Sequence, residues 1–396
     1  MIKQAIILAA GEGKRLRPFT ETMPKVMLPV ANKPIIEHVI EAVKQSGISE
    51  IIIVVGYKKE VIMEYFKDYK DIKIVYVNQD KQLGTSHALL QVEKFLDKNF
   101  IVLSGDNIIN YRSILQLIDD KSDLSILIKE HPHPSKYGVV SIENKFLKQI
   151  IEKPEEKIDR FISTGIYKLN KTVIKQIKEL AELGIYDLTS VIQSLIKNKI
   201  SISTIITDSW TDIVYPWDLL SVNENMSREI NKSTAGLIEK GVVIKGAVSI
   251  EKDTKIYSGS YIVGPVIIGK GCEIGPNACI FPSSAIGNNS VIGSFSEIRN
   301  CVIMNDVHIG SNNNLSNSII GKGCNINNNF STISGDTTIE IENEFTKISN
   351  IGVMIGEDCE IHGNAVAQPG VIIGRKCKID PLKHIYKNIP SGTKVM

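Results

Sequence analysis

The residues that follow the first predicted strand combine glycine, positive charge and proline in a way that suits phosphate chemistry. Residues 4–10 are an apolar run without polar alternation, which predicts a buried parallel strand. A glycine-rich turn directly after such a strand is where an α/β sheet offers backbone N–H groups to a phosphate. The loop over residues 11–34 carries five cations and four prolines: Lys14, Arg15, Arg17, Lys25, Lys33, Pro18, Pro24, Pro29 and Pro34. Several cations on a proline-stiffened loop fit a triphosphate whose charge grows during a reaction.

Neither of the two common glycine-rich phosphate motifs fits this loop. A dinucleotide-binding fingerprint needs a third glycine three residues after Gly13, where Leu16 stands. A Walker loop needs Gly-Lys-Ser/Thr after four spacers, and the sequence has no such run. A solvated basic loop is the alternative, but exposed charge runs rarely carry so much glycine and proline. A triphosphate-binding loop is therefore the better interpretation.

Two isolated aspartates could hold a metal ion beside that triphosphate. Asp106 follows an apolar run that starts at Ile101, and Asp212 lies after Trp210 with apolar residues around it. Mg²⁺ prefers one or two carboxylates together with phosphate oxygens, so the pair could share one ion. A turn aspartate after glycine is the alternative interpretation of Asp106.

A polar stretch over residues 78–87 follows a strand predicted at 72–77 and leads into a helix that starts near Ala88. A glutamine side chain such as that of Gln79 can pair with the edge of a base. Gly84 would let the backbone come close to that base. An ordinary strand-to-helix loop with a Ser or Thr cap is the alternative.

The elements that must position these residues alternate through the first 230 positions. Further strands are predicted at 51–55 and 72–77, and helices at 35–46, 58–69 and 218–228. Such alternation predicts a doubly wound, Rossmann-like α/β domain whose chemistry lies at the carboxyl ends of its strands.

The second half follows a different period. From Ile244 to Ile298 an isoleucine recurs every six residues, and after two one-residue slips the pattern resumes. A period of six gives three short strands per coil, which predicts a parallel β-helix. An α-helix cannot hold this pattern, because six residues turn its apolar side by more than half a turn. Four cysteines stand two residues before a periodic isoleucine and are expected to pack inside the coils: Cys272, Cys324, Cys359 and Cys377.

Length and composition set outer bounds on the function. With 396 residues, the chain can hold two or three domains, and a net charge of +2 argues against a nucleic-acid partner. Its apolar runs are only of strand length, so no membrane span is expected. The chain enters a strand at once without a signal peptide, and no C-x-x-C pair occurs, which favours a reduced, cytoplasmic protein.

The first 230 residues resemble the sugar-1-phosphate nucleotidylyltransferases. The matching positions are Gly11-x-Gly13-x-Arg15-Leu16-x-Pro18-x-Thr20, Pro24-Lys25, Pro29-Val30 and Lys33-Pro34. The resemblance implies that Arg15 and Lys25 bind the triphosphate and stabilise the transition state, with Mg²⁺ held by Asp106 and Asp212. It further implies a nucleotide site at Leu8, Ala10, Gly11, Gly13, Gln79, Gly84 and Thr85, and a sugar-phosphate site at Gly138, Glu152, Lys153 and Thr164.

The same resemblance bears on the substrates. The Gln-Leu-Gly-Thr-x-His-Ala run that ends at Ala88 is similar to the uracil- or thymine-reading loop of the N-acetylglucosamine-1-phosphate uridylyltransferases. Guanylyltransferases for mannose usually lack that glutamine and histidine, which disfavours GTP. Ser163 stands where many members carry asparagine or glutamate, so the 2-substituent of the sugar stays open. The implied reaction is attack of a sugar 1-phosphate, of the glucose or N-acetylglucosamine class, on the α-phosphorus of UTP or dTTP with release of pyrophosphate.

The order of the two halves resembles bifunctional enzymes that add a glucosamine-1-phosphate acetyltransferase on a trimeric left-handed β-helix. The motif transfer is poor, because the family's His-Leu-Ser-Tyr-like segment corresponds to Asn-Leu-Ser-Asn at residues 314–317. His308 or His362 could serve as the base, and Lys347 falls near the family's lysine-bearing loop. Acetyl-CoA is thus a candidate co-substrate, and a homotrimer is expected. A non-catalytic subunit that senses nucleotide sugars is a third reading, but a sensor would not need the metal pair.

The predicted organisation is a nucleotidylyltransferase domain over residues 1–223, a linker helix over 224–240 and a β-helix over 241–396. The period breaks near residues 335–349, which predicts a loop inserted at a corner of the β-helix.

Overall fold

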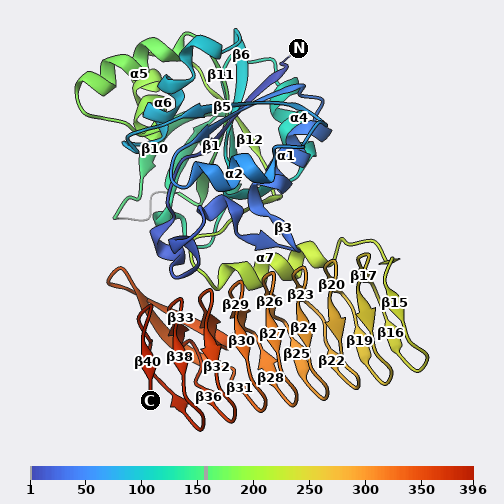
Figure 1. The fold of residues 1–396 in the computed structure, drawn as a ribbon. Helices are drawn as coiled ribbons and strands as arrows, with labels where there is room; N and C mark the ends of the chain where they lie inside the picture. Colours follow the sequence, from blue (N-terminus) through green and yellow to red (C-terminus); the bar gives the residue numbers. More distant parts are fainter. Residues whose placement is uncertain (1, 156–158) are drawn as a thin grey trace. The chain divides into compact units, whose positions relative to one another are not determined.

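The computed structural model describes residues 2–155 and 159–396. The chain divides into two compact units (Figure 1). The first comprises Met1–Glu12, Met23–Met27 and Ile35–Asp212, and the second comprises Gly13–Thr22, Leu28–Pro34 and Ile213–Met396. The opening loop is therefore shared: Lys25 belongs to the first unit and Arg15 to the second. The predicted domain bounds stay a prediction.

The first unit is built on one sheet with the strand order β5-β4-β1-β6-β11-β8-β12-β10-β9. Its strands are β1 (Gln4–Ala9), β4 (Glu50–Val55), β5 (Lys73–Asn78), β6 (Asn99–Ser104), β8 (Ser125–Glu130), β9 (Gly138–Glu143), β10 (Phe146–Glu152), β11 (Phe161–Asn170) and β12 (Ser203–Ile206). The central strand β1 runs parallel to β4 and β6, and β11 then runs antiparallel to β6. The α/β class is confirmed.

Helices cover both faces of this sheet (Figure 1). They are α1 (Ile35–Gln45), α2 (Lys59–Tyr65), α3 (Thr85–Gln91), α4 (Tyr111–Asp119), α5 (Val173–Glu182) and α6 (Leu188–Lys197). Apolar residues of α1, α2 and α4 pack in one core, and those of α3, α5 and α6 in the other. Successive β1 residues alternate between the two cores, with Ile7 in the first and Ile6 in the second. Burial on both faces explains why this strand lacks polar alternation.

The second unit contains a left-handed parallel β-helix of three sheets. The first sheet is formed by β14 (Ser233–Thr234), β17 (Val248–Ile250), β20 (Val266–Ile268), β23 (Ser284–Ile286), β26 (Val302–Ile303), β29 (Ile319–Ile320), β34 (Met354–Ile355) and β37 (Ile372–Ile373). The second is formed by β15 (Leu237–Ile238), β18 (Lys255–Ile256), β21 (Glu273–Ile274), β24 (Val291–Ile292), β27 (His308–Ile309), β30 (Asn325–Ile326), β35 (Glu360–Ile361), β38 (Lys378–Ile379) and β40 (Lys394–Val395). The third is formed by β16 (Val243–Lys245), β19 (Tyr261–Val263), β22 (Cys279–Ile280), β25 (Glu297–Arg299), β28 (Asn314–Ser316), β31 (Ser331–Thr332), β36 (Val366–Ala367) and β39 (His384–Ile385).

The periodic isoleucines stack along the axis of the coils. Ile274 pairs with Ile292, which pairs with Ile309, so a coil shortened by one residue still keeps its strand register. The shortening is taken up at a corner, where residues such as Asn300 adopt a left-handed backbone conformation that asparagine tolerates. The four cysteines predicted to pack inside the coils all lie in this core, so that prediction is confirmed.

The break in the period is a β-hairpin. Strands β32 (Gly335–Ile341) and β33 (Glu344–Ile351) pair antiparallel, and Glu342 and Asn343 form the tip. Both tip residues have positive φ values, of 52° and 65°, as a two-residue type I′ turn requires. The hairpin therefore presents acidic residues at its end.

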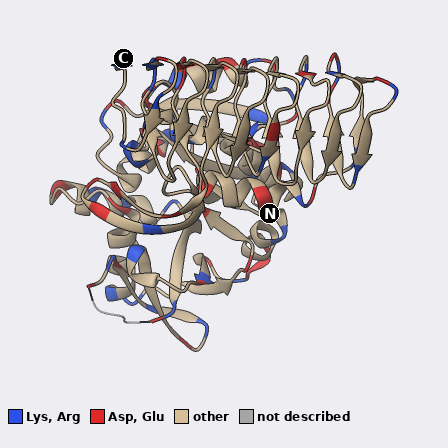
Figure 2. Cartoon of the chain, turned by 90° about the horizontal axis from the view of Figure 1, so that it is seen from below, with Lys and Arg blue, Asp and Glu red and all other residues tan. Residues whose placement is uncertain are grey.

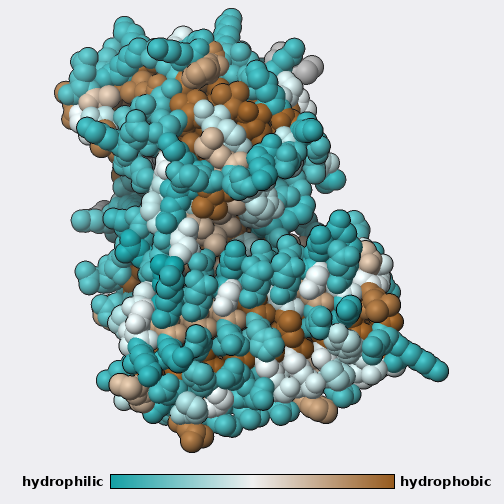
Figure 3. Space-filling view, in the orientation of Figure 1, coloured by the Kyte–Doolittle hydropathy of each residue, from teal (hydrophilic) through white to brown (hydrophobic). Residues whose placement is uncertain are grey.

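Charged residues of both signs are mixed along the chain (Figure 2), and apolar residues are visible on both parts of the space-filling view (Figure 3). Figure 2 shows Lys and Arg interspersed with Asp and Glu, in keeping with a net charge of +2. Figure 3 shows the coil edges largely hydrophilic, with apolar residues between them. Among the described helices, none is both long and apolar enough for a membrane crossing.

A buried asparagine joins three segments of the second unit. Asn223 lies on α7 (Asp218–Ser227), and its Nδ2 donates to Ser283 O at 2.8 Å. Its Oδ1 accepts from Ala31 N at 3.0 Å, in the turn between β2 (Pro29–Val30) and β3 (Lys33–Pro34). The two ends of one side-chain amide thus pair with the backbone N–H of Ala31 and the carbonyl of Ser283. Nothing in the sequence indicates that these groups are joined.

We expect Asn223→Ala to lower the stability of the protein, because it leaves the Ala31 N–H and the Ser283 carbonyl without their partner. Each unsatisfied buried group costs about 1–3 kcal/mol, which urea unfolding would measure. Ser221→Ala on the exposed side of the same helix is the control and should change stability by less than about 0.5 kcal/mol. Equal stability of the two variants would contradict this role of Asn223.

Candidate active site

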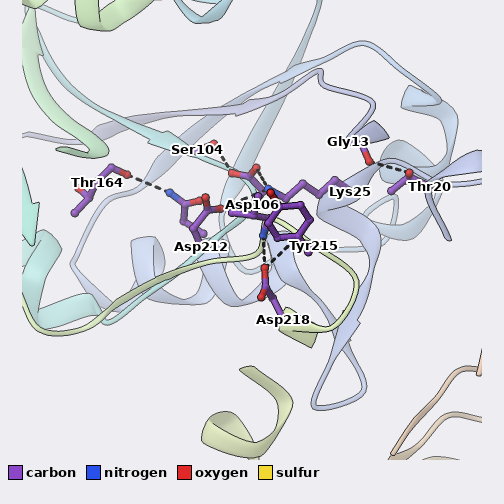
Figure 4. Close-up of polar contacts among 11 residues, drawn as sticks. Gly13, Thr20, Lys25, Ser104, Asp106, Thr164, Asp212, Tyr215 and Asp218 are labelled. Atoms are coloured by element: carbon purple, nitrogen blue, oxygen red, sulfur yellow. Dashed lines mark hydrogen bonds and ion pairs between the residues drawn. The ribbon is translucent and has the colours of Figure 1, made fainter. Parts of the chain in front are cut away.

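Lys25, Asp106 and Asp212 come together in the first unit (Figure 4). Lys25 Nζ lies 2.5 Å from Asp106 Oδ2 and 3.5 Å from Asp212 Oδ1. Lys25 begins a 3-10 turn, Asp106 follows β6, and Asp212 ends β13 (Trp210–Asp212). The short strand β7 (Asn107–Ile109) pairs with β13 so that Asn107 lies opposite Asp212. This pairing brings together two carboxylates that are 106 positions apart in the sequence.

Each of the three side chains is mostly buried, with 14%, 24% and 19% of its surface exposed for Lys25, Asp106 and Asp212. Burial by itself lowers the pKa of Lys25, but the two carboxylates outweigh it and the pKa is raised above its ordinary value. Burial raises the pKa of Asp106, but the Lys25 ammonium and a hydrogen bond from Ser104 outweigh it, and the pKa is lowered. Lys25 and Asp106 therefore both carry their charges at neutral pH.

The two carboxylates fit a divalent cation. The Lys25 ammonium lies within 3.5 Å of both, which shows that Asp106 and Asp212 can face a single positive charge. Within the described ranges, no group of three or more His, Cys, Asp or Glu residues is arranged to hold a metal. Two protein carboxylates would leave the remaining coordination positions to water and phosphate, which is the pattern that Mg²⁺ prefers.

The backbone carbonyl of Thr164 accepts a hydrogen bond from Asn107, the residue that follows Asp106. Asn107 Nδ2 donates to Thr164 O at 3.1 Å, and Thr164 Oγ1 donates to Leu127 O at 2.8 Å. The register of β11 against β8 shifts between Ser163 and Tyr167, and Gly165 has a φ of 74° there. The irregular strand directs the carbonyl of Thr164 to Asn107, and its hydroxyl is used within the protein.

Three of the predicted sugar-phosphate residues lie near one another at one end of β9 and β10. Gly138 is opposite Glu152 in the sheet, and a side chain at Gly138 would come within 3.1 Å of Glu152 Oε2. Thr189 Oγ1 donates to Glu152 Oε2 at 3.0 Å. Lys153 follows Glu152, and its backbone N–H donates to Tyr137 O at 2.9 Å. Sequence reasoning missed Thr189, because a threonine near the start of a helix carries no signal of its own.

Ser163 faces the same group of residues. Its hydroxyl lies 3.1 Å from Tyr167 Oη and accepts from Gly165 N at 3.2 Å. Burial raises the pKa of Tyr167 to about 12, so its phenol stays protonated and can donate. A small hydroxyl at Ser163 leaves more room than the asparagine or glutamate that the resemblance leads one to expect.

The predicted nucleotide residues of the first unit lie at the ends of β1 and β5. Leu8 O accepts from Gly105 N and Ala10 O accepts from Tyr57 N, which joins the end of β1 to its neighbours. A side chain at Gly11 would meet no atom within 4 Å. Further residues of this set lie in the loop after β5 and at the first position of α3: Gln79, Gly84 and Thr85.

Arg15 belongs to the second unit, where it contacts the hairpin. Its Nε lies 3.2 Å from Glu342 Oε2, and its Nη2 lies 3.9 Å from Glu344 Oε1. Tyr215 Oη donates to Glu344 Oε2 at 2.5 Å. Gly13, with a φ of 75°, accepts from Thr20 Oγ1 at 2.9 Å and so shapes the turn that carries Arg15. Sequence reasoning placed Arg15 on a triphosphate and did not anticipate these carboxylates.

The candidate acetyltransferase residues are dispersed. His308 lies exposed on β27 between Val291 and Asn325 of the adjacent coils, whereas Lys347 lies opposite Thr338 in the hairpin. His362 Nδ1 is 3.2 Å from Asn327 Nδ2. No contact between His308 and Lys347 is found among the described residues.

Comparisons with known proteins cover both halves of the chain. A family model described as Nucleotidyl transferase matches residues 4–229, and one described as GMPPB C-terminal domain matches residues 262–346. The Methanocaldococcus jannaschii protein named Bifunctional protein GlmU is 35% identical, over 98% of this chain and 96% of its own. A Sulfurisphaera tokodaii protein named bifunctional sugar-1-phosphate nucleotidylyltransferase/acetyltransferase is 33% identical over 98% of each chain.

A solved structure agrees with the fold of the first part. It is assigned as a glucose-1-phosphate thymidylyltransferase of Bacillus anthracis and has 29% identity and a TM-score of 0.53. The match covers 58% of this chain and 97% of that one. The Nucleotidyl transferase model spans more than half of the 396 residues, and the two relatives match nearly the whole chain. The chain therefore belongs to the nucleotidyl transferase family and is a sugar-1-phosphate nucleotidylyltransferase.

Proposed function

We propose that Lys25, Asp106 and Asp212 form the catalytic centre for attack of a sugar 1-phosphate on UTP or dTTP. The convergence of one ammonium and two carboxylates carries this proposal. A sugar phosphate oxygen forms a bond to the α-phosphorus, and the bond from that phosphorus to pyrophosphate breaks. The attacking phosphate is already ionised at neutral pH, so the reaction needs no general base.

The charges of the centre suit this reaction. One ammonium against two carboxylates leaves a net charge of about −1, which can attract a divalent cation. We assign Mg²⁺ to Asp106 and Asp212, where it would supply positive charge beside the phosphate oxygens. Lys25 is tied to the carboxylates in the described structure and can turn to a phosphate oxygen once a cation neutralises them. Arg15 is proposed as the second cation for the triphosphate.

The sugar phosphate is assigned to the group around Glu152. Glu152 and Thr189 can hydrogen-bond to sugar hydroxyls, and Gly138 keeps the space beside them free. Lys153 supplies positive charge for the phosphate. Thr164 is assigned to the same site through its backbone atoms. Ser163 does not decide between a sugar of the glucose class and one of the N-acetylglucosamine class.

A second activity, acetyl transfer from acetyl-CoA to glucosamine 1-phosphate, is favoured by one finding. The Sulfurisphaera relative named for both activities aligns over 98% of this chain, including the β-helix. Homotrimers through the β-helix belong to the same proposal. Thiol release from acetyl-CoA in the presence of glucosamine 1-phosphate tests it, and His308→Ala, His362→Ala and Lys347→Ala test the three candidate residues.

We expect Asp106→Asn to lower the rate of pyrophosphate release from UTP and glucose 1-phosphate by about 10²–10³-fold, the usual cost of removing one electrostatic group from an active site. The amide has the shape of the carboxylate but neither its charge nor its affinity for a cation, so more Mg²⁺ should be needed for half-maximal rate.

Asp71→Asn is the matched control, because Asp71 pairs with Lys44 on the surface with more than half of its side chain exposed. This variant should keep the rate and the Mg²⁺ dependence of the natural protein. Wild-type turnover by Asp106→Asn would contradict the proposed centre.

A separate prediction concerns the hairpin tip. A triphosphate that binds Arg15 must replace Glu342 and Glu344, so the double variant Glu342→Gln/Glu344→Gln should bind UTP more tightly. The side chain of Arg15 is 35% exposed and those of the two glutamates are 48% and 54% exposed. Such exposed pairs contribute up to about 1 kcal/mol, so the KM for UTP should fall by up to about fivefold. Glu340→Gln, on the same hairpin, is the control. An unchanged or raised KM in the double variant would contradict competition for Arg15.

A further inference from the structure

The side chain of Gln79 is held in one orientation by its neighbours. Gln79 is only 4% exposed and directly follows β5, where its backbone N–H donates to Val55 O at 2.8 Å. Its Nε2 lies 3.2 Å from Gly84 O and 2.9 Å from His87 Nδ1. Both recorded side-chain hydrogen bonds of Gln79 in the described structure thus use the same end of the amide.

The chemistry of these partners fixes which end that is. A backbone carbonyl only accepts hydrogen bonds, so the amide end that faces Gly84 O must be the NH₂ group. One hydrogen of Nε2 then goes to Gly84 O, and the other goes to the lone pair of His87 Nδ1. Oε1 is therefore at the opposite end of the amide, where it can act only as an acceptor.

The surroundings keep these partners in place. A side chain at Gly84, which has a φ of 155°, would come within 2.3 Å of Tyr186 O, so only glycine fits there. Tyr186 O accepts from Ser86 N at 2.9 Å, and the His87 ring packs edge-on against the Tyr186 ring, with 5.8 Å between centroids. Gln91, one helical turn after His87, lies 3.2 Å from the other ring nitrogen. That atom of Gln91 is its Nε2, which also donates to His87 O at 3.2 Å. A neutral imidazole has one acceptor nitrogen, and the shorter contact, 2.9 Å from Gln79 Nε2, assigns the lone pair to Nδ1.

An acceptor at Oε1 discriminates between pyrimidines. Uracil and thymine carry a hydrogen on N3, which can donate to Oε1, whereas N3 of cytosine is an acceptor and would face Oε1 without a proton between them. A site that is built to hydrogen-bond its substrate rejects an analogue that leaves one of its polar groups unpaired. This rejection is stronger than the one that a hydrophobic pocket achieves by shape.

We propose that His87 is a positioning residue for nucleotide choice: by accepting from Gln79 Nε2 at Nδ1, it holds Oε1 ready for N3–H of uracil or thymine. The inference rests on the proposed function, in which Gln79 contacts the base. Without His87, one hydrogen of the buried Nε2 loses its partner, and other rotations of the amide become accessible.

Four variants of the full chain test this. His87→Asn places an amide oxygen close to where Nδ1 stands and should keep the hydrogen bond, whereas His87→Leu has a similar shape but no acceptor. His87→Gln extends its amide toward the position of Nε2 and so leaves no acceptor at the position of Nδ1. It replaces His87→Leu in the test if that variant does not fold. His133→Leu makes the same substitution at an exposed histidine of the first unit.

The measurement is the ratio of the Kd values for CTP and UTP in the presence of Mg²⁺ without sugar phosphate, obtained by calorimetry. The ratio should stay near that of the natural protein in His87→Asn and His133→Leu. It should fall about tenfold in His87→Leu and His87→Gln, as expected for loss of one hydrogen bond. An unchanged ratio in both His87→Leu and His87→Gln would overturn the role of His87. If the natural protein itself bound CTP as well as UTP, the proposed nucleotide choice would be wrong, and the inference would fall with it.

Discussion

Two carboxylates that share a mostly buried position repel each other, and the ammonium of Lys25 offsets that repulsion between Asp106 and Asp212. Both carboxylates lie within 3.5 Å of Lys25 Nζ, and the pKa values of Lys25 and Asp106 move in the directions that keep both ionised. The arrangement holds the carboxylates ready for a second cation. It also holds Lys25 at a position from which a phosphate could draw it away.

The sheet and its small antiparallel partner are what place the carboxylates. Asp106 follows the end of β6, and the pairing of β7 with β13 brings Asp212 close to it. Lys25 reaches the centre from the segment Met23–Met27, whose flanking segments on both sides belong to the second unit. The peptide chain therefore runs from Arg15 through Lys25 to the turn that Asn223 holds.

The sequence predicts some of this architecture well, and for physical reasons. An inward residue every six positions is needed to fill each face of a coil, so the β-helix is evident from its isoleucines alone. The alternation of buried strands and amphipathic helices likewise predicts the first unit. The ion pairs of Arg15 with Glu342 and the hydrogen bond of Thr189 to Glu152 could not be predicted, because they join distant residues of ordinary type. The composition of the opening loop also does not indicate that the loop is divided between two units.

The rate of pyrophosphate release by Lys25→Met at saturating UTP, glucose 1-phosphate and Mg²⁺ tests the central role of Lys25 most directly. Lys44→Met, which removes an exposed ammonium paired with Asp71, provides the comparison. We predict a loss of at least about 10²-fold for Lys25→Met, since an electrostatic group in an active site contributes that much, and no more than a twofold change for Lys44→Met. Equal rates for the two folded variants would contradict the account.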